Sequence, residues 1–409
     1  MVTDPNGNTT TYYPDPKDRV VKAVDALGNT ASYSYTSDSN VSQYIDGSGG
    51  QTNLSYDSLN NLTKVTEPTN TSTSYAYGDS THPYYPTSTT DAQGNPTQYS
   101  YDAAGNLSSA TDALGHVTRY AYNSNSTVAS ITDANGNVTS FQYDRSGNLT
   151  GIIYPSPLGP VTYAYDGLSR LTSTTDGRDQ KTTYAYDALD RLIQVTYADG
   201  SSVSFAYDAD GNQTAMTGST GTTTYSYDPL GRQIKKTLPG GQSISYTWDG
   251  VDNLTSKTDN GGTANFGYNA VNLLTSITDP TGAVTTFQYD ADYGRTQVAY
   301  PNGVTGTISR NANEQIAGIM WKNGSGAVLL SRSYSYVDPS TNQPTELRYT
   351  VMGPEANTTT TYGYDALNRL LEAKTTNGGG SMTDDRSYTY DAVGNQLSQD
   401  VNGTTTNYT

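Results

Sequence analysis

Few residues in this chain could support acid–base or metal chemistry. Its 409 residues include only two histidines, His82 and His116, and no cysteine. A histidine acts as a catalyst or a metal ligand only when a nucleophile, a carboxylate or another ligand lies beside it. Neither histidine has a recognisable partner of that kind at a useful spacing. We interpret both as exposed loop residues, and we predict no catalytic residue, no metal site and no cofactor.

The many aspartates raise the question of calcium binding. The chain has 39 acidic residues, yet it contains neither an Asp-x-Asp-x-Asp-Gly loop nor a Gly-Gly-x-Gly-x-Asp run. Those two patterns place enough oxygen ligands around one calcium ion. We therefore interpret the aspartates as turn formers, and calcium binding remains the alternative.

The aspartates belong to a repeat that is anchored on an aromatic residue, usually followed by Asp. The anchors recur at spacings of 20 to 24 residues from Tyr35 to Tyr289, and Arg310 occupies the next anchor position, 21 residues on. From Arg310 to Tyr390 the spacings widen to between 26 and 28 residues. Each period holds two turns of the form Asp-x-x-Gly, with stretches of about six or seven residues between them. Two turns and two short strands per period predict one β-hairpin per repeat.

The turn chemistry follows from the residue types. An Asp side chain can accept a hydrogen bond from the backbone two residues on, and the Gly three residues on supplies a left-handed backbone that closes the hairpin. Where that Gly is absent, its position holds residues that, apart from the serine, tolerate the same conformation. These residues are Asn60, Ser169, Asp190, Asp252, Asn272 and Asn368.

Along each predicted strand, successive side chains alternate between the two faces, as in a pleated sheet. In Tyr184-Ala185-Tyr186 the two tyrosines fall on one face, because side chains repeat every two residues in a strand. A leucine often stands five positions after the Asp, as in Leu107 and Leu171. Stacked hairpins should therefore carry ladders of Tyr pairs and a row of Leu, with each cross-strand aromatic pair contributing about 0.2–1 kcal/mol.

We expect a structural role for the residues of this repeat motif. They are Tyr56, Asp57, Tyr101, Asp102, Gly105, Tyr143, Asp144, Gly147, Tyr165, Asp166, Tyr186, Asp187, Tyr207, Asp208, Gly211, Tyr227, Asp228, Gly231, Tyr364, Asp365, Tyr390, Asp391 and Gly394.

The segments Tyr165-Asp166-Gly167-Leu168-Ser169-Arg170-Leu171 and Tyr364-Asp365-Ala366-Leu367-Asn368-Arg369-Leu370 closely resemble the Rhs/YD-repeat family. That family includes bacterial Rhs and wall-associated polymorphic toxins, the B and C components of Tc toxins, and animal teneurins. The resemblance implies a spiral β-sheet that encloses a hollow shell. In the bacterial toxin members the shell holds a C-terminal toxin, which a core region after the repeats releases by aspartyl autoproteolysis. The chain ends within repeat-like sequence, so we carry over no catalytic residue and expect neither a toxin nor a core protease domain.

Strand geometry independently favours a hollow form. Eighteen hairpins would supply about 36 strands, and at about 4.8 Å per strand the ribbon would be about 170 Å wide. A barrel of about eight strands is already filled by side chains, so this array must spiral, split or enclose space. A propeller is the competing fold, but it would need about nine blades, against the typical 4–8. We predict an all-β array spanning residues 1–409, with about 17–18 repeats of about 21 residues that become less regular at 300–390.

Composition narrows the possible partners. Apolar residues make up 33% of the chain, against the usual share of about 45–50%, whereas Tyr occurs 37 times. A net charge of −17 disfavours nucleic acid and anionic membranes as partners, and no apolar run is long enough to span a bilayer. We expect a piece of a longer secreted or cell-surface protein, with any export signal elsewhere.

Two functions remain open at this stage. The first is a passive scaffold: the repeats form the wall of a shell around a polypeptide cargo, completed by flanking repeats, plug domains or a second chain. The second is a cell-surface adhesion or carbohydrate-binding module, although Trp248 and Trp321 are the only tryptophans. The irregular region from Arg310 to Gly353 is interpreted as decayed repeats, with a partner-contact or shell-closing element as the alternative.

Overall fold

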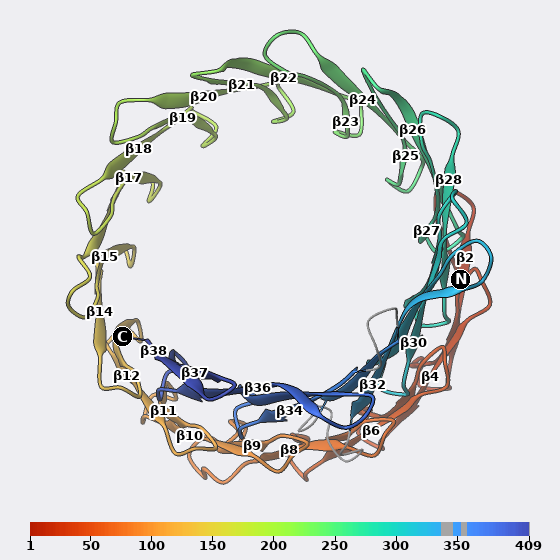
Figure 1. Ribbon diagram of the computed structural model, residues 1–409. Helices are drawn as coiled ribbons and strands as arrows, with labels where there is room; N and C mark the ends of the chain where they lie inside the picture. Colours follow the sequence, from red (N-terminus) through yellow and green to blue (C-terminus); the bar gives the residue numbers. More distant parts are fainter. Residues whose placement is uncertain (337–346, 353–357, 409) are drawn as a thin grey trace. The chain divides into compact units, whose positions relative to one another are not determined.

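The computed structural model describes residues 1–336, 347–352 and 358–408, and these residues form 38 β-strands (Figure 1). Nothing in this part of the chain is a helix of the length and apolarity that a membrane crossing requires. Two compact units are present. Unit 1 comprises Met1–Val117, Gly267–Ile277 and Ala283–Thr409, and unit 2 comprises Thr118–Phe266 and Thr278–Gly282.

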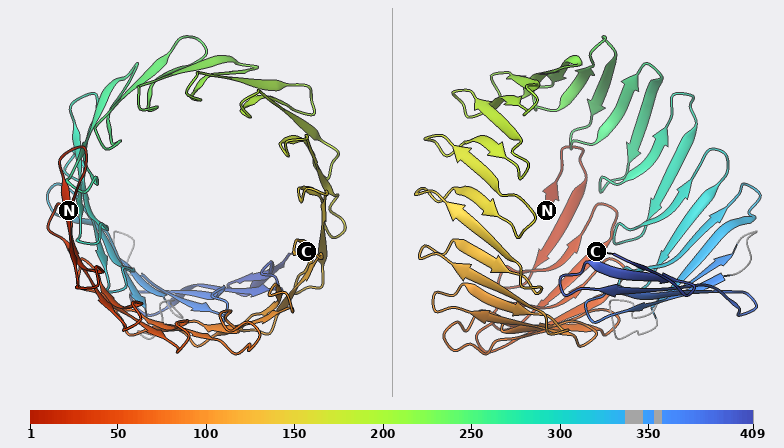
Figure 2. Two further views of the ribbon diagram at one scale, coloured as in Figure 1. Left: turned by 180° about the vertical axis from the view of Figure 1, so that it is seen from behind. Right: turned by 60° about the vertical axis from the view of Figure 1, so that its left-hand side comes forward.

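Unit 2 is a run of consecutive antiparallel hairpins, visible in green and yellow in Figure 2. Its strands are β12 (Val117–Tyr122), β13 (Val128–Thr132), β14 (Val138–Tyr143), β15 (Leu149–Ile153), β16 (Val161–Tyr165), β17 (Leu171–Thr175), β18 (Lys181–Tyr186), β19 (Leu192–Thr196), β20 (Ser202–Tyr207), β21 (Gln213–Gly218), β22 (Gly221–Tyr227), β23 (Gln233–Thr237), β24 (Ser243–Trp248), β25 (Leu254–Asp259) and β26 (Gly262–Tyr268).

Unit 1 contains two such runs. The first is β1 (Val2–Thr3), β2 (Thr9–Pro14), β3 (Val20–Val24), β4 (Thr30–Tyr35), β5 (Val41–Ile45), β6 (Gln51–Tyr56), β7 (Leu62–Thr66), β8 (Ser72–Ala76), β9 (Ser88–Thr90), β10 (Pro96–Tyr101) and β11 (Leu107–Thr111). The second is β27 (Leu274–Thr278), β28 (Val284–Tyr289), β29 (Arg295–Ala299), β30 (Thr305–Arg310), β31 (Ile316–Lys322), β32 (Val328–Tyr336), β33 (Leu347–Met352), β34 (Thr358–Tyr364), β35 (Leu370–Asn377), β36 (Met382–Tyr390), β37 (Gln396–Val401) and β38 (Thr404–Asn407).

Each repeat has two kinds of turn. We call the turn that follows the anchor aromatic the YD turn, and the other the return turn. At the YD turn between β16 and β17, Tyr165 pairs with Leu171 while Ala164 pairs with Ser173, so the register shifts by one residue. This β-bulge accompanies a hairpin loop that contains a residue in the left-handed conformation. The same shift recurs beside the anchors Tyr186 and Tyr207.

The sheet has almost no buried core. Among the described residues, Val195 and Ala373 are the buried apolar side chains, each 9% exposed. In β18 the side chains alternate between exposed and half-buried, and the predicted tyrosine pair Tyr184 and Tyr186 lies on the half-buried face. Backbone pairing and this shielded face, and not a packed interior, therefore hold the repeats together.

These observations confirm the predicted all-β array of tandem hairpins, and the strand count is close to the expected number. The propeller alternative is wrong for unit 2, because pairing runs unbroken from β12 to β26 instead of ending after every fourth strand. The region predicted to be irregular has longer strands, such as β32 with nine residues. Part of it, residues 337–346 and Gly353, lies outside the described residues.

Candidate functional site

The YD turn is organised around the Asp carboxylate. In the turn that opens at Asp166, the backbone amides of Leu168 and Arg170 donate to Oδ1 over 2.9 and 3.0 Å. Nε of Arg170 donates to Oδ2 over 2.7 Å, and this hydrogen bond is the main reason that the pKa of Asp166 lies below its ordinary value. The predicted bond to the residue two positions on is confirmed. The hydrogen bonds that the carboxylate accepts from the residue four positions on, here Arg170, were not predicted.

Other YD turns use Asn instead of Arg as the fourth residue after Asp. Nδ2 of Asn106 donates to Oδ2 of Asp102 over 3.0 Å, and Asn212 and Asn395 bond to Asp208 and Asp391 in the same way. The backbone amides and the Asn side chain of the same turn bind these carboxylates, so the aspartates act as turn formers, as predicted.

The left-handed position also matches the prediction. The motif glycines there, Gly105, Gly147, Gly211, Gly231 and Gly394, have φ between 76° and 95°. The residues that replace glycine have φ between 61° and 67°, and they are Asn60, Ser169, Asp190, Asp252, Asn272 and Asn368. Ser169, the exception in the sequence pattern, adopts the same conformation as the others.

Most of the anchor tyrosines join their repeat to the preceding one. The Tyr186 hydroxyl donates to the backbone carbonyl of Leu171, at the start of the second strand of the previous hairpin. The equivalent hydroxyls of Tyr35, Tyr56, Tyr77, Tyr101, Tyr165, Tyr207, Tyr227, Tyr289 and Tyr390 do the same over 2.6 to 3.0 Å. Trp248 occupies an anchor position and donates through Nε1 to Gln233 over 2.9 Å. Two further anchors, Tyr143 and Tyr364, are half-buried.

The turn arginines reach forward to the next repeat. Arg191 holds Asp187 through Nε, while its terminal nitrogen donates to the backbone carbonyl of Asp208 over 2.8 Å. Its guanidinium lies 4.8 Å from the centroid of the Tyr207 ring, a cation–π contact. Arg19, Arg170 and Arg369 make the same combination of contacts with the next YD turn and its anchor tyrosine. The repeat motif thus forms a chain of contacts that runs from one repeat to the next.

The interpretation of both histidines as exposed loop residues is wrong. Each is half-buried and bonded to an aspartate: Nδ1 of His82 lies 2.8 Å from Asp79 Oδ2, and Nδ1 of His116 lies 2.9 Å from Asp112 Oδ2. His116 stands four residues after Asp112, so it takes the place that Asn or Arg holds in other turns. That spacing was visible in the sequence and could have predicted the contact.

Turns that are far apart in sequence meet within unit 1, where β2–β6 lie beside β28–β30 (Figure 1). The backbone amides of Gly47 and Ser48, in a return turn, donate to the two carboxylate oxygens of Asp292, in a YD turn, over 2.8 and 3.0 Å. One repeat further on, the Thr69 amide donates to Oδ1 of Asn313 over 3.0 Å. We call this contact between YD turns and return turns the seam.

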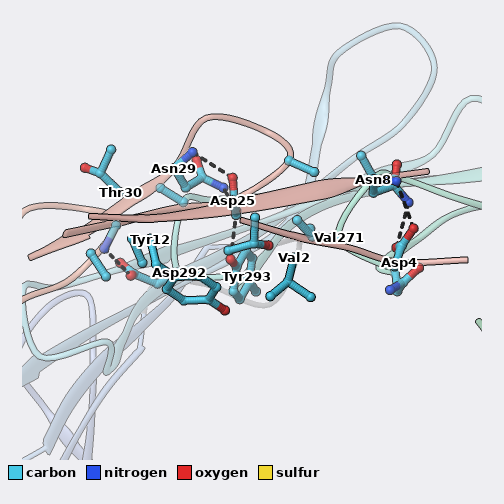
Figure 3. Close-up of a pocket in the computed structure, with 18 of the residues that line it drawn as sticks. Val2, Asp4, Asn8, Tyr12, Asp25, Asn29, Thr30, Val271, Asp292 and Tyr293 are labelled. Carbon is cyan, nitrogen blue, oxygen red and sulfur yellow. Dashed lines mark hydrogen bonds between the residues drawn. The ribbon is translucent and has the colours of Figure 1, made fainter. Parts of the chain in front are cut away.

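A cavity of about 560 Å³ lies at the seam. Its lining includes Tyr12, Asp25, Val271 and Tyr293, and the Tyr293 hydroxyl donates to Asp25 over 2.7 Å (Figure 3). Burial, and then the bond to Asp25, raises the pKa of Tyr293 to about 12. Sequence reasoning missed the seam, because its partners are 244 to 268 residues apart.

Arg310, the one charged residue at an anchor position, also lies near the seam. Its terminal nitrogen donates to the backbone carbonyl of Glu314 over 3.0 Å, and Nε lies 3.8 Å from a Glu314 carboxylate oxygen. Burial, followed by the carboxylates of Asp290 and Asp292, raises the pKa of Glu314. The predicted irregular region therefore begins at the seam.

Comparisons with known proteins agree with this geometry. The profile of the family described as RHS Repeat matches residues 2–30, 86–117, 101–128, 122–157, 165–203, 207–241, 227–264 and 268–305, which together make up more than half of the chain. No curated protein matches the sequence.

Several solved structures share the fold. They include the crystal structure of TcdB2-TccC3-Cdc42 and the structure of the Photorhabdus luminescens Tc holotoxin pore with a substitution in TccC3. Each of these two matches with a TM-score of 0.78 at 15% identity, over 98% of this chain and 26% of the other. This chain therefore spans about a quarter of the length of those chains. The likeness supports the predicted fold class, an all-β repeat array of the shell type.

Proposed function

Because this chain belongs to the RHS repeat family, we propose that it is a structural scaffold, part of the wall of a shell, and not an enzyme. The observation that carries the proposal is the double connection between repeats. Consecutive strands pair through the backbone, and the anchor tyrosines and turn arginines add side-chain bonds between neighbouring hairpins. These side-chain bonds connect neighbouring repeats into one continuous sheet, as the wall of a shell requires.

Such a wall would work by exclusion. Paired strands lie about 4.8 Å apart, and the space between them is closed by hydrogen bonds and side chains. A polypeptide cannot pass through it, so a protease outside would not reach a chain inside. We propose that the cargo is a polypeptide, that flanking repeats or plug domains of a longer protein complete the wall, and that the protein is secreted or lies at the cell surface.

Limited proteolysis of the natural full-length polypeptide tests this proposal. The segment that the repeats enclose should survive protease for much longer than the same segment produced alone. A variant with Tyr165, Tyr186 and Tyr207 all changed to Phe should lose part of that protection, because three bonds between repeats are missing. Equal digestion of the enclosed and the free segment would refute the scaffold function.

We do not propose the alternative of a carbohydrate-binding module. Both tryptophans already have partners within the chain: Trp248 donates to Gln233, and Trp321 stacks on Tyr300 with ring centroids 6.0 Å apart. Trp321 also lies against Gly306, where a Cβ atom would come within 2.7 Å of the indole ring. Glycan binding that is lost when the exposed Tyr197 is changed to Ala would restore this alternative.

A further inference from the structure

Arg310 stands where the other anchor positions hold an aromatic ring, and its guanidinium lies among carboxylates. Together with Asp46, Asp290 and Glu314 it lines a second cavity, of about 570 Å³, between a return turn and two YD turns. Arg310 is the one cation among the lining residues that the structure describes. Its Nε is buried without a hydrogen-bond partner in this part of the chain and lies 3.8 Å from the Glu314 carboxylate. Nearby carboxylates, and not a hydrogen bond at this nitrogen, therefore balance its charge.

The return turn that opens at Asp46 and the YD turn that opens at Asp290 touch through their backbones. The Gly47 amide donates to Asp292, and a Cβ atom at Gly47 would overlap the carbonyl oxygen of Ala291. No side chain fits between the two turns at this point. The backbone contact therefore brings the carboxylates of both turn openings to one cavity.

The Asp290 carboxylate and the Arg310 guanidinium come together beside Gly294. A Cβ atom at Gly294 would lie 2.7 Å from Asp290 Oδ2 and 2.9 Å from Arg310 Nε. Glu314 faces the same place, where the carboxylates of both turns and the guanidinium act on its charge. Four carboxylates, those of Asp46, Asp290, Asp292 and Glu314, thus meet one guanidinium, and the site carries an excess of negative charge.

The next YD turn makes the same kind of seam contact without these charges. It opens with Asn311 where the turn before it opens with Asp290, and it carries Asn313 where that turn carries Asp292. Asn313 accepts a backbone amide across the seam as Asp292 does. An amide oxygen is therefore sufficient for the bond, and the carboxylates add charge that the contact itself does not need.

We propose that the seam is a pH-dependent contact, which strengthens when Glu314 takes up a proton and weakens when Glu314 is ionised, with Arg310 as its counter-ion. Ionised Glu314 adds a fourth negative charge to the three aspartates of the two turns, and its proton removes that repulsion. Asp292, and not Glu314, accepts the bonds that cross the seam here, so these bonds keep their acceptor. The property belongs to unit 1 itself and does not depend on the proposed wall function.

The direction of the effect follows from the pKa of Glu314. Burial, and then the charges of Asp290 and Asp292, raises this pKa from 4.5, so the folded chain holds the proton more tightly than the unfolded chain. The resulting stabilisation is complete below pH 4.5 and is lost as the pH rises through the raised pKa. The seam should therefore weaken between mildly acidic and neutral pH.

Hydrogen exchange at the Gly47 amide, measured on the whole chain, tests the proposal. The protection factor, which is corrected for the intrinsic exchange rate at each pH, should rise about two- to fivefold as the pH falls from about 8 to about 5, the usual effect of a partly exposed charge pair. In Glu314→Gln, which resembles the protonated form, protection should already be high at about pH 8 and change little. Equal pH dependence in both chains would overturn the proposal.

The matched control is Asp18→Asn. Asp18 occupies the same left-handed turn position as Glu314, with φ 64° against 59°, but it is exposed and lies in the YD turn between β2 and β3. This variant changes the net charge by the same amount and should keep the pH dependence at Gly47. If it loses that dependence as Glu314→Gln does, the overall charge decides the strength of the seam, and the proposal is overturned.

A second pair of variants tests the role of Arg310. Arg310→Gln removes the one cation of the site and should lower the protection of the Gly47 amide at about pH 8, where Glu314 is ionised. Adding Glu314→Gln to the same chain should restore part of this loss, because one of the opposing charges is then gone. A loss that Glu314→Gln leaves unchanged would show that Arg310 acts only through its bond to the Glu314 carbonyl, and would overturn its assignment as the counter-ion.

Discussion

The bond from an anchor tyrosine to the preceding repeat can be removed without disturbing the ring. Tyr165 and Tyr163 lie on the same face of β16, and both are half-buried. The Tyr165 hydroxyl donates to the carbonyl of Leu149 over 2.9 Å, whereas the Tyr163 hydroxyl makes no hydrogen bond to the described part of the chain. The variants Tyr165→Phe and Tyr163→Phe therefore differ in one bond between repeats, at the same cost in apolar contact.

The expected magnitude follows from the chemistry of a neutral hydrogen bond, which contributes about 0.5–1.5 kcal/mol net. Tyr165→Phe should lower the free energy of unfolding by about 1 kcal/mol, and Tyr163→Phe should leave it nearly unchanged. Tyr186 and Tyr207 bond to different carbonyls in the two following repeats. Because the three bonds share no partner, the triple Phe variant should lose about 3 kcal/mol.

Chemical denaturation followed by circular dichroism gives the global change, and amide hydrogen exchange locates it. A loss of 1 kcal/mol should speed exchange by opening in β15 to β17 about fivefold, since this is the matching change in the opening equilibrium. Equal effects of the Tyr165 and Tyr163 variants would refute the reasoning. They would mean that the hydroxyls matter for solvation or strand propensity and not for the bond between repeats.

Three further predictions concern the seam and the turns. The pKa of Tyr293 is raised from 10.0 to about 12, and its neutral hydroxyl is the donor to Asp25. This bond should therefore stabilise the fold fully below about pH 10 and be lost as the pH rises through about 12. The difference in melting temperature between the unchanged chain and Tyr293→Phe should shrink to zero between those two pH values. Asp292→Ala should speed hydrogen exchange at the Gly47 amide, while Asp292→Asn, which keeps an amide oxygen as acceptor, should restore part of the protection. Ser126→Gly should raise the free energy of unfolding by up to about 1 kcal/mol, because Ser126 is held at φ 62° and glycine adopts that conformation without strain; a lower denaturation midpoint would contradict this.

The local structure of the chain could be predicted well from the sequence. The Asp-x-x-Gly spacing predicted the turns, including the left-handed backbone at Asn60 and Asp190, because turn geometry depends on neighbours within about five residues. Alternation predicted the shared face of Tyr184 and Tyr186. The error over His116 was local too: the imidazole replaces the usual Asn as a partner of the turn carboxylate.

Only the tertiary structure decided which turns meet at the seam and where the anchor hydroxyls and turn arginines point. The hydroxyl bonds cross 14 to 16 residues in most repeats, and the seam crosses 244 to 268. Strand twist adds up over many hairpins, so small differences per repeat determine which distant turns come together. This accumulated twist cannot be read from any short spacing in the sequence. In the sequence Asp292 and Asn313 therefore resemble any other turn residue, and only the folded structure brings Gly47 and Thr69 into contact with them.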